Sequence, residues 1–329
     1  MNVFIAGSTG VLGHRLVAKF TDSGHDVVGL TRDESGDQLV EARGGDPVRG
    51  DIFDRESLVS AAEGADVVVH AATAIPTKEK PTAEDWKLND RVRREGAENL
   101  SAAAAEVGAQ RYLQQSISWV ARQPDGETFD ESATPHPDRT TESALDAEQI
   151  AKEAGNEHGF ETVVLRCGWF YAPDAAHTKT IGEGLLAKEL PIVGTGLLGR
   201  NDAELSILHV EDAARAFVAA AEGDATGLYH VVDDEPVTVA NLFSEFADKL
   251  GAPEPRRVPG WLAKYLTGEH TVRLLTSPAP TSAEKFKRDF DWQPKYPTYR
   301  EGVEAVVEQW NAEGTLTEPA ESNEWKAAA

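Results

Sequence analysis

A glycine turn between a strand and a helix, at residues 7–13, constrains the fold of this chain more than any other feature. Residues 3–5 are apolar, glycines follow at three-residue spacing, and an apolar periodicity extends from Val11 to Phe20. Such a turn leaves backbone N–H groups free at the positive end of a helix dipole, where a pyrophosphate binds. We predict a dinucleotide site here; the alternative is a glycine-rich turn between two core elements. The predicted contact residues are Gly7, Ser8, Thr9, Gly10, Val11, Leu12 and Gly13.

Strands and helices alternate along most of the chain up to residue 166. Continuous apolar runs, such as residues 65–70, are typical of strands buried on both faces. Alternation of this kind implies right-handed crossovers between parallel strands. The predicted fold is therefore α/β, a doubly wound parallel sheet of the Rossmann type. After residues 3–5, its strands are predicted at 26–30, 46–49, 65–70, 111–115, 161–165 and 227–232.

The regular alternation stops after Arg166 and returns near residue 206. Residues 169–199 are rich in glycine, proline and aromatic side chains, and helices joined by loops follow residue 237. In open parallel sheets the ligand lies outside the carboxyl ends of the strands, so a second domain there would form one wall of the substrate pocket. We predict a dinucleotide-binding domain (1–168 and 206–236), a smaller, mostly helical substrate domain (169–205 and 237–311) and a flexible tail (312–329).

Acidic side chains dominate the charge of the chain. Asp and Glu number 56 and Lys and Arg 32, for a formal net charge of −24. Such a surface repels nucleic acid and anionic membranes, so neither is an expected partner. The acidic residues are scattered along the chain, and arginine outnumbers lysine. We interpret the composition as that of a folded protein from a salt-loving organism, because molar salt screens the self-repulsion.

Cys167 is the only cysteine. An intramolecular disulfide and a cysteine-based zinc site are therefore excluded, and the acidic residues are too scattered to nominate another metal site. The chain starts directly on its first strand and has no apolar run of membrane-spanning length. We expect a cytoplasmic protein.

Several further stretches accompany the glycine spacing. Gly50-Asp51-Ile52 follows the third predicted strand, His70-Ala71-Ala72 ends the fourth, and later motifs occupy residues 207–212 and 229–236. With these motifs the chain resembles the extended short-chain dehydrogenase/reductases, the NAD-dependent epimerase/dehydratase-like proteins, from residue 1 to about 310. The resemblance implies that Asp51 and Ile52 meet the adenine and that Ala71 and Ala72 lie under the cofactor.

The end of the second predicted strand bears on the choice of cofactor. NAD-selective relatives carry an acidic residue there, which accepts hydrogen bonds from the ribose 2′-hydroxyl. This chain has Thr31 and Arg32 instead, and an arginine can make charge-assisted bonds to a 2′-phosphate. We predict NADP(H), with NAD possible because Asp33 is next in sequence and could accept the ribose bonds after a one-residue shift.

The chain departs from the family at its usual catalytic pair, Tyr-x-x-x-Lys. Aligning Ala147-Glu148 with the family's Ala-Glu puts Thr140 at the tyrosine position and Ala144 at the lysine position. No tyrosine or lysine occurs between residues 120 and 151. Arg93 similarly stands where many relatives carry asparagine. The resemblance therefore implies an atypical member that lacks the usual proton relay.

Four residues are candidates for catalysis in place of that pair. Ser116 and Ser118 follow the fifth predicted strand, where the family places a serine that hydrogen-bonds the reacting carbonyl; the alternative is that they cap the strand. Tyr171 could supply a phenol proton, although the matching turn is usually structural. His136 could act as a general acid, or it is an exposed loop histidine.

Taken together, these observations favour an NADP(H)-binding oxidoreductase-like protein that acts on a small carbonyl, hydroxyl or sugar-derived compound. Two alternatives remain open: a non-catalytic NADP(H)-binding sensor or assembly factor, and a nucleotide-sugar epimerase or dehydratase. The substrate would be a small molecule, and the protein a monomer or homodimer.

Overall fold

Seven parallel strands form the central sheet of the computed structural model, which describes residues 1–76, 81–267, 269–317 and 324–325. The strand order is β11-β6-β5-β4-β1-β2-β3, and every neighbouring pair is parallel. The predicted doubly wound α/β fold is confirmed. The strands are β1 (Asn2–Ala6), β2 (Asp26–Thr31), β3 (Asp46–Arg49), β4 (Val67–His70), β5 (Arg111–Ile117), β6 (Glu161–Cys167) and β11 (Gly227–Val231).

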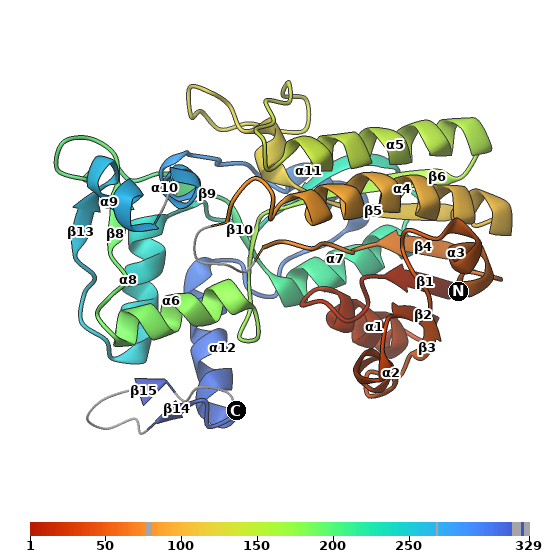
Figure 1. Cartoon of the computed structure of the whole chain (residues 1–329), viewed down its shortest axis with the longest axis horizontal. Coiled ribbons are helices and arrows are strands. Elements are labelled where there is room, and N and C mark those ends of the chain that lie inside the picture. Colours follow the sequence, from red (N-terminus) through yellow and green to blue (C-terminus); the bar gives the residue numbers. More distant parts are fainter. Residues whose placement is uncertain (77–80, 268, 318–323, 326–329) are drawn as a thin grey trace.

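Helices cover both faces of this sheet because its central strands are apolar on both sides. One apolar cluster joins one sheet face to α1 (Gly13–Asp22), α7 (Val210–Glu222) and α11 (Glu284–Phe290). The other face packs against α3 (Arg55–Ala61), α4 (Lys87–Val107) and α5 (Glu142–His158). The short helix α2 (Glu34–Glu41) packs beside β2 and β3. Figure 1 shows α4 and α5 side by side over the sheet.

The order of strands reverses between β1 and β4. The chain runs outward from β1 through β2 to β3, and then returns to start the other half of the sheet at β4. The carboxyl ends of β1 and β4 therefore border the crevice in which sheets of this type bind their ligands.

A second lobe lies beyond the carboxyl ends of the strands, on the left in Figure 1. Its apolar cluster contains Phe243, Phe246 and Trp310. Three short strand pairs, β7–β10, β8–β13 and β9–β12, stabilise it. Its elements are β7 (Trp169–Tyr171), α6 (Ala176–Leu186), β8 (Ile192–Gly194), β9 (Glu204–Leu205), β10 (Ile207–His209), β12 (Val237–Thr238), α8 (Val239–Leu250), β13 (Arg257–Pro259), α9 (Gly260–Thr267), α10 (Glu269–Thr276) and α12 (Tyr299–Ala312).

Several details differ from the pattern read from the sequence. Strand β4 begins at Val67 and not at residue 65, and β5 and β6 continue to Ile117 and Cys167. The apolar segment at residues 207–209 pairs with β7 outside the central sheet. The region predicted as a tail contains a paired β14 (Leu316–Thr317) and β15 (Glu324–Trp325); residues 318–323 and 326–329 lie outside the described residues. In the part of the chain that the structure describes, no helix is both long and apolar enough to cross a bilayer.

Candidate functional site

Two of the three glycines in the 7–13 turn, Gly7 and Gly13, are packed too closely to accept a side chain. Gly7 has φ +92°, and a Cβ atom there would lie 2.5 Å from the backbone nitrogen of Ala72. A Cβ on Gly13 would lie 1.8 Å from the carbonyl oxygen of Gly7. Gly10 differs, because a Cβ atom added there would contact only the carbonyl oxygen of Gly7, at 3.4 Å. Gly7 and Gly13 therefore close the turn, whereas Gly10 is exposed on its outer side.

Free backbone donors follow the turn. The N–H of Gly10 donates to the carbonyl of Gly7 at 3.1 Å, but those of Val11, Leu12 and Gly13 have no acceptor among the described residues. Helix α1 starts here, so these donors lie at the positive end of its dipole. The Ser8 hydroxyl donates to the Leu30 carbonyl at 2.7 Å and is buried. Only the backbone of Ser8 can therefore face a ligand.

The end of β2 presents one cation without a partner. Thr31 is buried, and its hydroxyl donates to Asp37 Oδ1 at 2.5 Å. Asp33 caps α2: it accepts bonds from the Ser35 hydroxyl at 2.7 Å and the Gly36 N–H at 2.9 Å, and these bonds hold its pKa below the usual value. Arg32 is exposed and makes no ion pair or hydrogen bond with the described residues.

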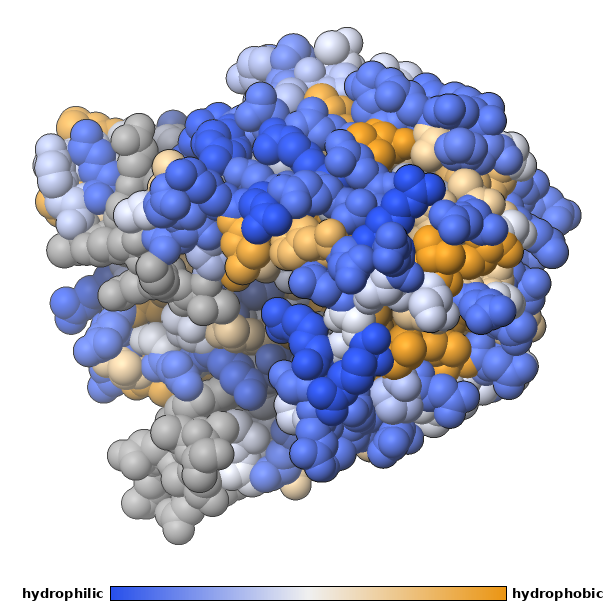
Figure 2. All heavy atoms as spheres, turned by 45° about the vertical axis from the view of Figure 1, so that its right-hand side comes forward, coloured by the Kyte–Doolittle hydropathy of each residue, from blue (hydrophilic) through white to orange (hydrophobic). Residues whose placement is uncertain are grey.

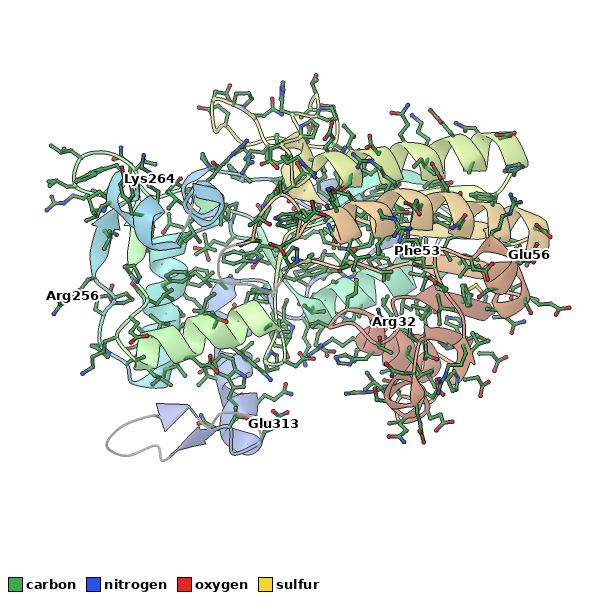
Figure 3. All side chains as sticks on the ribbon, viewed as in Figure 1. Arg32, Phe53, Glu56, Arg256, Lys264 and Glu313 are labelled. Atoms are coloured by element: carbon green, nitrogen blue, oxygen red, sulfur yellow. The ribbon has the colours of Figure 1, made fainter. Side chains whose placement is uncertain are left out.

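The expected adenine contacts lie beside α4. The Asp51 carboxylate accepts the Phe53 N–H at 3.0 Å, and the guanidinium of Arg91 lies 4.3 Å from the centre of the Phe53 ring. Ile52 lies under α4, where a Cβ on Gly96 would meet its Cδ1 at 2.8 Å. Figure 3 shows Phe53 and Arg32 on the half of the molecule that carries the sheet. Ala71 and Ala72, as expected, follow β4 directly below the glycine turn.

The position of the missing catalytic pair is the α4–α5 corner, by which we mean Arg93, Thr140, Ser143 and Ala144. Ala144 is buried, and the Thr140 hydroxyl donates to Asp138 Oδ1 at 2.6 Å. Arg93 Nη1 reaches across from α4 to the Thr140 carbonyl at 2.9 Å and to Ser143 Oγ at 3.4 Å. A guanidinium thus lies beside Thr140 and Ala144, the positions predicted to align with the family's tyrosine and lysine.

Ser116 belongs to a buried ion-pair network that holds α5 against the sheet. Its hydroxyl donates to Glu148 Oε1 at 2.5 Å, and the same carboxylate binds Arg166 Nε and Nη2 at 2.8 and 2.7 Å. Glu148 and Arg166 are both buried. The Glu148–Arg166 pair was missed from the sequence, because nothing in the spacing of two residues on different elements indicates that they meet.

The other three catalytic candidates lie in different surroundings. Ser118 is fully buried and its hydroxyl has no partner among the described residues. His136 is exposed. The Tyr171 hydroxyl is buried against Gly302 of α12, and burial raises its pKa well above the usual value. In the described part of the chain, no hydrogen bond joins these residues to one another or to Ser116, so their catalytic roles stay predictions.

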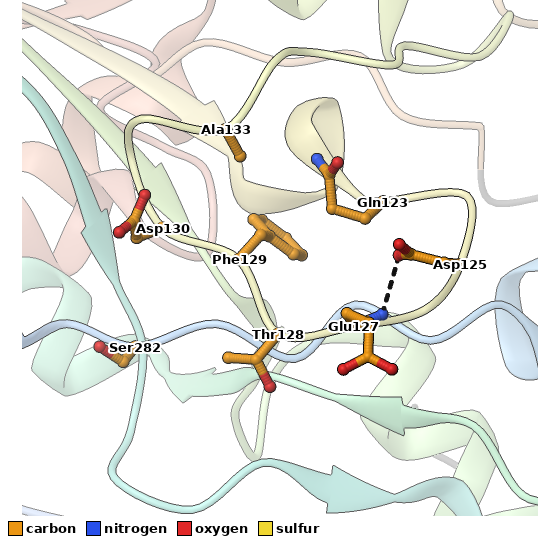
Figure 4. A pocket seen from close by; sticks show the side chains of 8 residues that line it. All are labelled: Gln123, Asp125, Glu127, Thr128, Phe129, Asp130, Ala133 and Ser282. Atoms are coloured by element: carbon orange, nitrogen blue, oxygen red, sulfur yellow. Dashed lines mark hydrogen bonds between the residues drawn. The ribbon is translucent and has the colours of Figure 1, made fainter.

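A hollow of about 550 Å³ lies elsewhere, in the loop that precedes α5. Figure 4 shows Asp125, Glu127, Asp130 and Phe129 around it, with Ser282 at one side. It contains no residue of the glycine turn, so it is not the predicted cofactor site. Among the described residues, no group of three or more His, Cys, Asp or Glu side chains is placed to hold a metal ion.

Comparison with known proteins agrees with this geometry. A model of the NAD dependent epimerase/dehydratase family matches residues 3–232. A 3-diazoavenalumate denitrifying reductase from Streptomyces sp is 34% identical over 92% of this chain and 99% of its own length. A 4-hydroxy-2-methyl-3-oxo-4-farnesyl-3,4-dihydroquinoline-1-oxide ketoreductase from Stigmatella aurantiaca is 30% identical over 86% and 84% of the two chains. The Thermus thermophilus UDP-glucose 4-epimerase, solved with NAD, shares the fold with a TM-score of 0.77 at 24% identity, over 94% of this chain and 99% of its own.

Proposed function

The chain belongs to the NAD-dependent epimerase/dehydratase family, and we propose that it is an NADPH-dependent reductase whose substrate accepts a hydride without receiving a proton from the protein. One observation carries this proposal: none of the four residues of the α4–α5 corner is a tyrosine or a lysine that could take part in the usual proton transfer. The Thr140 hydroxyl donates a hydrogen bond to Asp138, and Ala144 is apolar and buried. A positioned acid typically contributes about 10²–10⁴-fold to reactions that need one, so simple ketones would be poor substrates.

An aromatic diazo compound is the substrate class that fits such a corner. The Streptomyces relative is a denitrifying reductase of a diazo compound. NADPH would supply a hydride, so that an arenediazonium and NADPH give the arene, N₂ and NADP⁺, with no net proton taken from the protein. The chain's own residues would bind the phosphates with the free N–H groups of the glycine turn and would exclude water from the corner.

Turnover with two substrate types tests this function. The protein and NADPH are mixed with an arenediazonium carboxylate or with an aryl ketone, and loss of NADPH and release of N₂ are followed. We expect release of N₂ with the diazo compound, well above the rate without protein, and little ketone reduction. Equal or greater ketone reduction would instead favour a ketoreductase like the Stigmatella relative. No turnover of either compound, with NADPH bound, would favour a non-catalytic sensor.

Preference for NADP(H) over NAD(H) is a separate part of the proposal, and the partner-free Arg32 beside the occupied Asp33 supports it. A charge-assisted bond to a phosphate is worth about 1.5–3 kcal/mol. Arg32→Ala should therefore weaken NADPH binding about 10- to 100-fold and leave NADH unchanged. Arg43→Ala, another exposed arginine, is the control. Tighter NADH binding in the wild type, unaffected by Arg32→Ala, would overturn the preference.

We also propose a domain division, an adaptation to salt and an oligomeric state for this protein. The two-domain division assigns the cofactor to residues 1–168 and 206–236 and the substrate to 169–205 and 237–311. A salt-rich cytoplasm is proposed from the charge of −24; hydrophilic residues cover most of the face shown in Figure 2. The protein is proposed to act as a monomer or homodimer.

A further inference from the structure

Arg93 holds its guanidinium in place with one nitrogen, and the other two have no partner in the described part of the chain. Nη1 donates to the Thr140 carbonyl at 2.9 Å, which fixes the side chain between α4 and α5. Nε and Nη2 make no hydrogen bond and no ion pair with the described residues. These two N–H groups point in parallel from one edge of the guanidinium and form a fork that matches the two oxygens of a carboxylate.

The same fork is occupied in other arginines of this molecule. Four of them bind a carboxylate with both Nε and Nη2: Arg49 with Asp37, Arg91 with Glu95, Arg111 with Glu161, and Arg166 with Glu148. The nitrogen–oxygen distances in the pairs of Arg49, Arg91 and Arg166 range from 2.6 to 2.9 Å. Arg91 lies only two residues from Arg93 on the same helix. Arg93 therefore differs from Arg91 and Arg94, which lie on the same helix, in having a fixed fork without an acceptor among the described residues.

Arg93 has no carboxylate within ion-pair distance among the described residues. Asp90 pairs with Arg139 at 2.7 Å and Glu148 pairs with Arg166 at 2.7 Å, so each nearby carboxylate already has a cation. His70 is neutral at physiological pH, because burial lowers its pKa to about 4. Burial also lowers the pKa of Arg93, to about 10, which still leaves it charged at neutral pH. One positive charge thus remains among these described groups, in a chain whose net charge is −24.

A second donor without a partner lies one turn away on α4. Asn89 is fully buried, and its Oδ1 accepts the Ala74 N–H at 2.9 Å, which leaves Nδ2 without a partner among the described residues. Residues four apart on a helix share a face, so Asn89 and Arg93 direct donors to the same side of α4. A buried donor without an acceptor is costly, and an anionic ligand would supply one.

We propose that the Nε/Nη2 fork of Arg93 binds a carboxylate of the substrate, at the place where relatives hold their catalytic tyrosine and lysine. The inference rests on the proposed function in that the carboxylate belongs to the compound that is reduced. It adds a substrate class, aromatic carboxylates, and makes Arg93 a specificity-determining residue. Loss of the proton relay and gain of an anion site would then be one change in the same corner.

Binding to the NADP⁺-loaded protein tests the proposal without requiring turnover. Benzoate and 4-hydroxycinnamate serve as carboxylate probes, and their methyl esters are matched neutral probes. Their dissociation constants are measured by calorimetry at fixed ionic strength. We expect each acid to bind about 10- to 100-fold more tightly than its ester, as a charge-assisted bidentate pair predicts.

Three variants distinguish the bidentate geometry of the Arg93 guanidinium from its charge and from effects on folding. Arg93→Gln should abolish the preference for the acid, and Arg93→Lys should retain only part of it, because an ammonium has charge but no fork. Arg94→Gln removes the adjacent arginine, whose Nε already binds Asp146, and should leave the preference for the acid unchanged. NADPH titration of each variant shows whether the fold and cofactor site are intact.

Three outcomes would overturn the proposal. Equal affinity of acids and esters for the wild type would mean that no carboxylate site exists. A preference that survives in Arg93→Gln would place the site elsewhere. If Arg93→Gln loses NADPH affinity while Arg93→Lys keeps it, the charge of Arg93 binds the cofactor instead. A failure of diazo turnover with the acid preference intact would count against the proposed reaction alone.

Discussion

The glycine turn and the α4–α5 corner lie at the same end of the sheet, yet the chain builds them in different ways. The turn is contiguous, and its donors are backbone N–H groups that depend on two missing Cβ atoms, at Gly7 and Gly13. The corner brings together side chains from α4 and from the start of α5, more than 45 residues apart, at Arg93 and Thr140. Its chemistry depends entirely on which side chains are present.

This difference means that the two regions should tolerate substitutions to different degrees. A substitution at Gly7 or Gly13 would collide with backbone, so the turn tolerates few changes. Thr140 and Ala144 could be substituted because α5 is held independently, by the buried Glu148–Arg166 pair. Breaking such a pair on one side typically costs about 3–5 kcal/mol. The scaffold of the corner and its chemistry are thus separable.

The largest expected effect is at the turn. Gly13→Ala should abolish NADPH binding and lower the melting temperature, because its Cβ would lie 1.8 Å from the Gly7 carbonyl oxygen and the turn would have to open. Overpacking of this kind costs about 1–3 kcal/mol or more. Gly10→Ala is the matched control and should keep the fold, since the nearest contact of its Cβ atom is 3.4 Å. It should still weaken NADPH binding, because the new methyl group would cover the phosphate site. Wild-type affinity in Gly13→Ala would contradict the assignment of the cofactor site.

The next largest effect is expected from rebuilding the corner. Thr140→Tyr with Ala144→Lys should raise NADPH-dependent ketone reduction only when Arg93→Asn is added, because the new ammonium would otherwise lie beside an uncompensated guanidinium. A positioned acid predicts a gain of about 10²–10⁴-fold. The rates of the double and triple variants are compared with that of the wild type. A folded, cofactor-binding triple variant without any gain would show that the corner is not the site of chemistry.

A smaller effect, on stability, is expected at acidic pH from His70, which lies next to the α4–α5 corner. Burial lowers the pKa of His70 to about 4 from 6.5, so the unfolded chain binds its proton first as the pH falls. Stability is then lost progressively between about pH 6.5 and 4, by up to about 3 kcal/mol. Burial also lowers the pKa values of His209 and His230. His70→Gln should therefore flatten the pH dependence of the unfolding free energy only in part. The exposed His136→Gln is the control; equal slopes in both variants would contradict the assignment.

The smallest effect is expected from salt, which acts on the whole surface and on neither region in particular. At molar KCl the screening length falls to about 3 Å, so the repulsion among surplus acidic groups should largely disappear and the melting temperature should rise by several degrees. Thermal melts from low to molar KCl measure this. A melting temperature that stays flat or falls with salt would count against adaptation to a salt-rich cytoplasm.

The sequence by itself determined the parallel α/β fold and the position of the glycine turn. Both depend on short-range patterns, since apolar runs specify buried strands and glycine spacing specifies a backbone shape. It also revealed the absence of the catalytic pair, because absence from a local window needs no structure. Strand ends were misjudged by a few residues, and the partner of the segment at residues 207–209 could not be read, because a short apolar run does not name the strand that it pairs with.

Only the tertiary structure decided how the corner is occupied. From the sequence, Arg93 was a departure at one helix position, and Ser116 a candidate for catalysis. Folding brings Arg93 to Thr140 across two helices and ties Ser116 to Glu148. It also fills the carboxylate forks of Arg49, Arg91 and Arg166 and leaves that of Arg93 free. Whether a charged side chain has a partner depends on long-range packing, and for that reason no local pattern in the chain could have distinguished this arginine from the others.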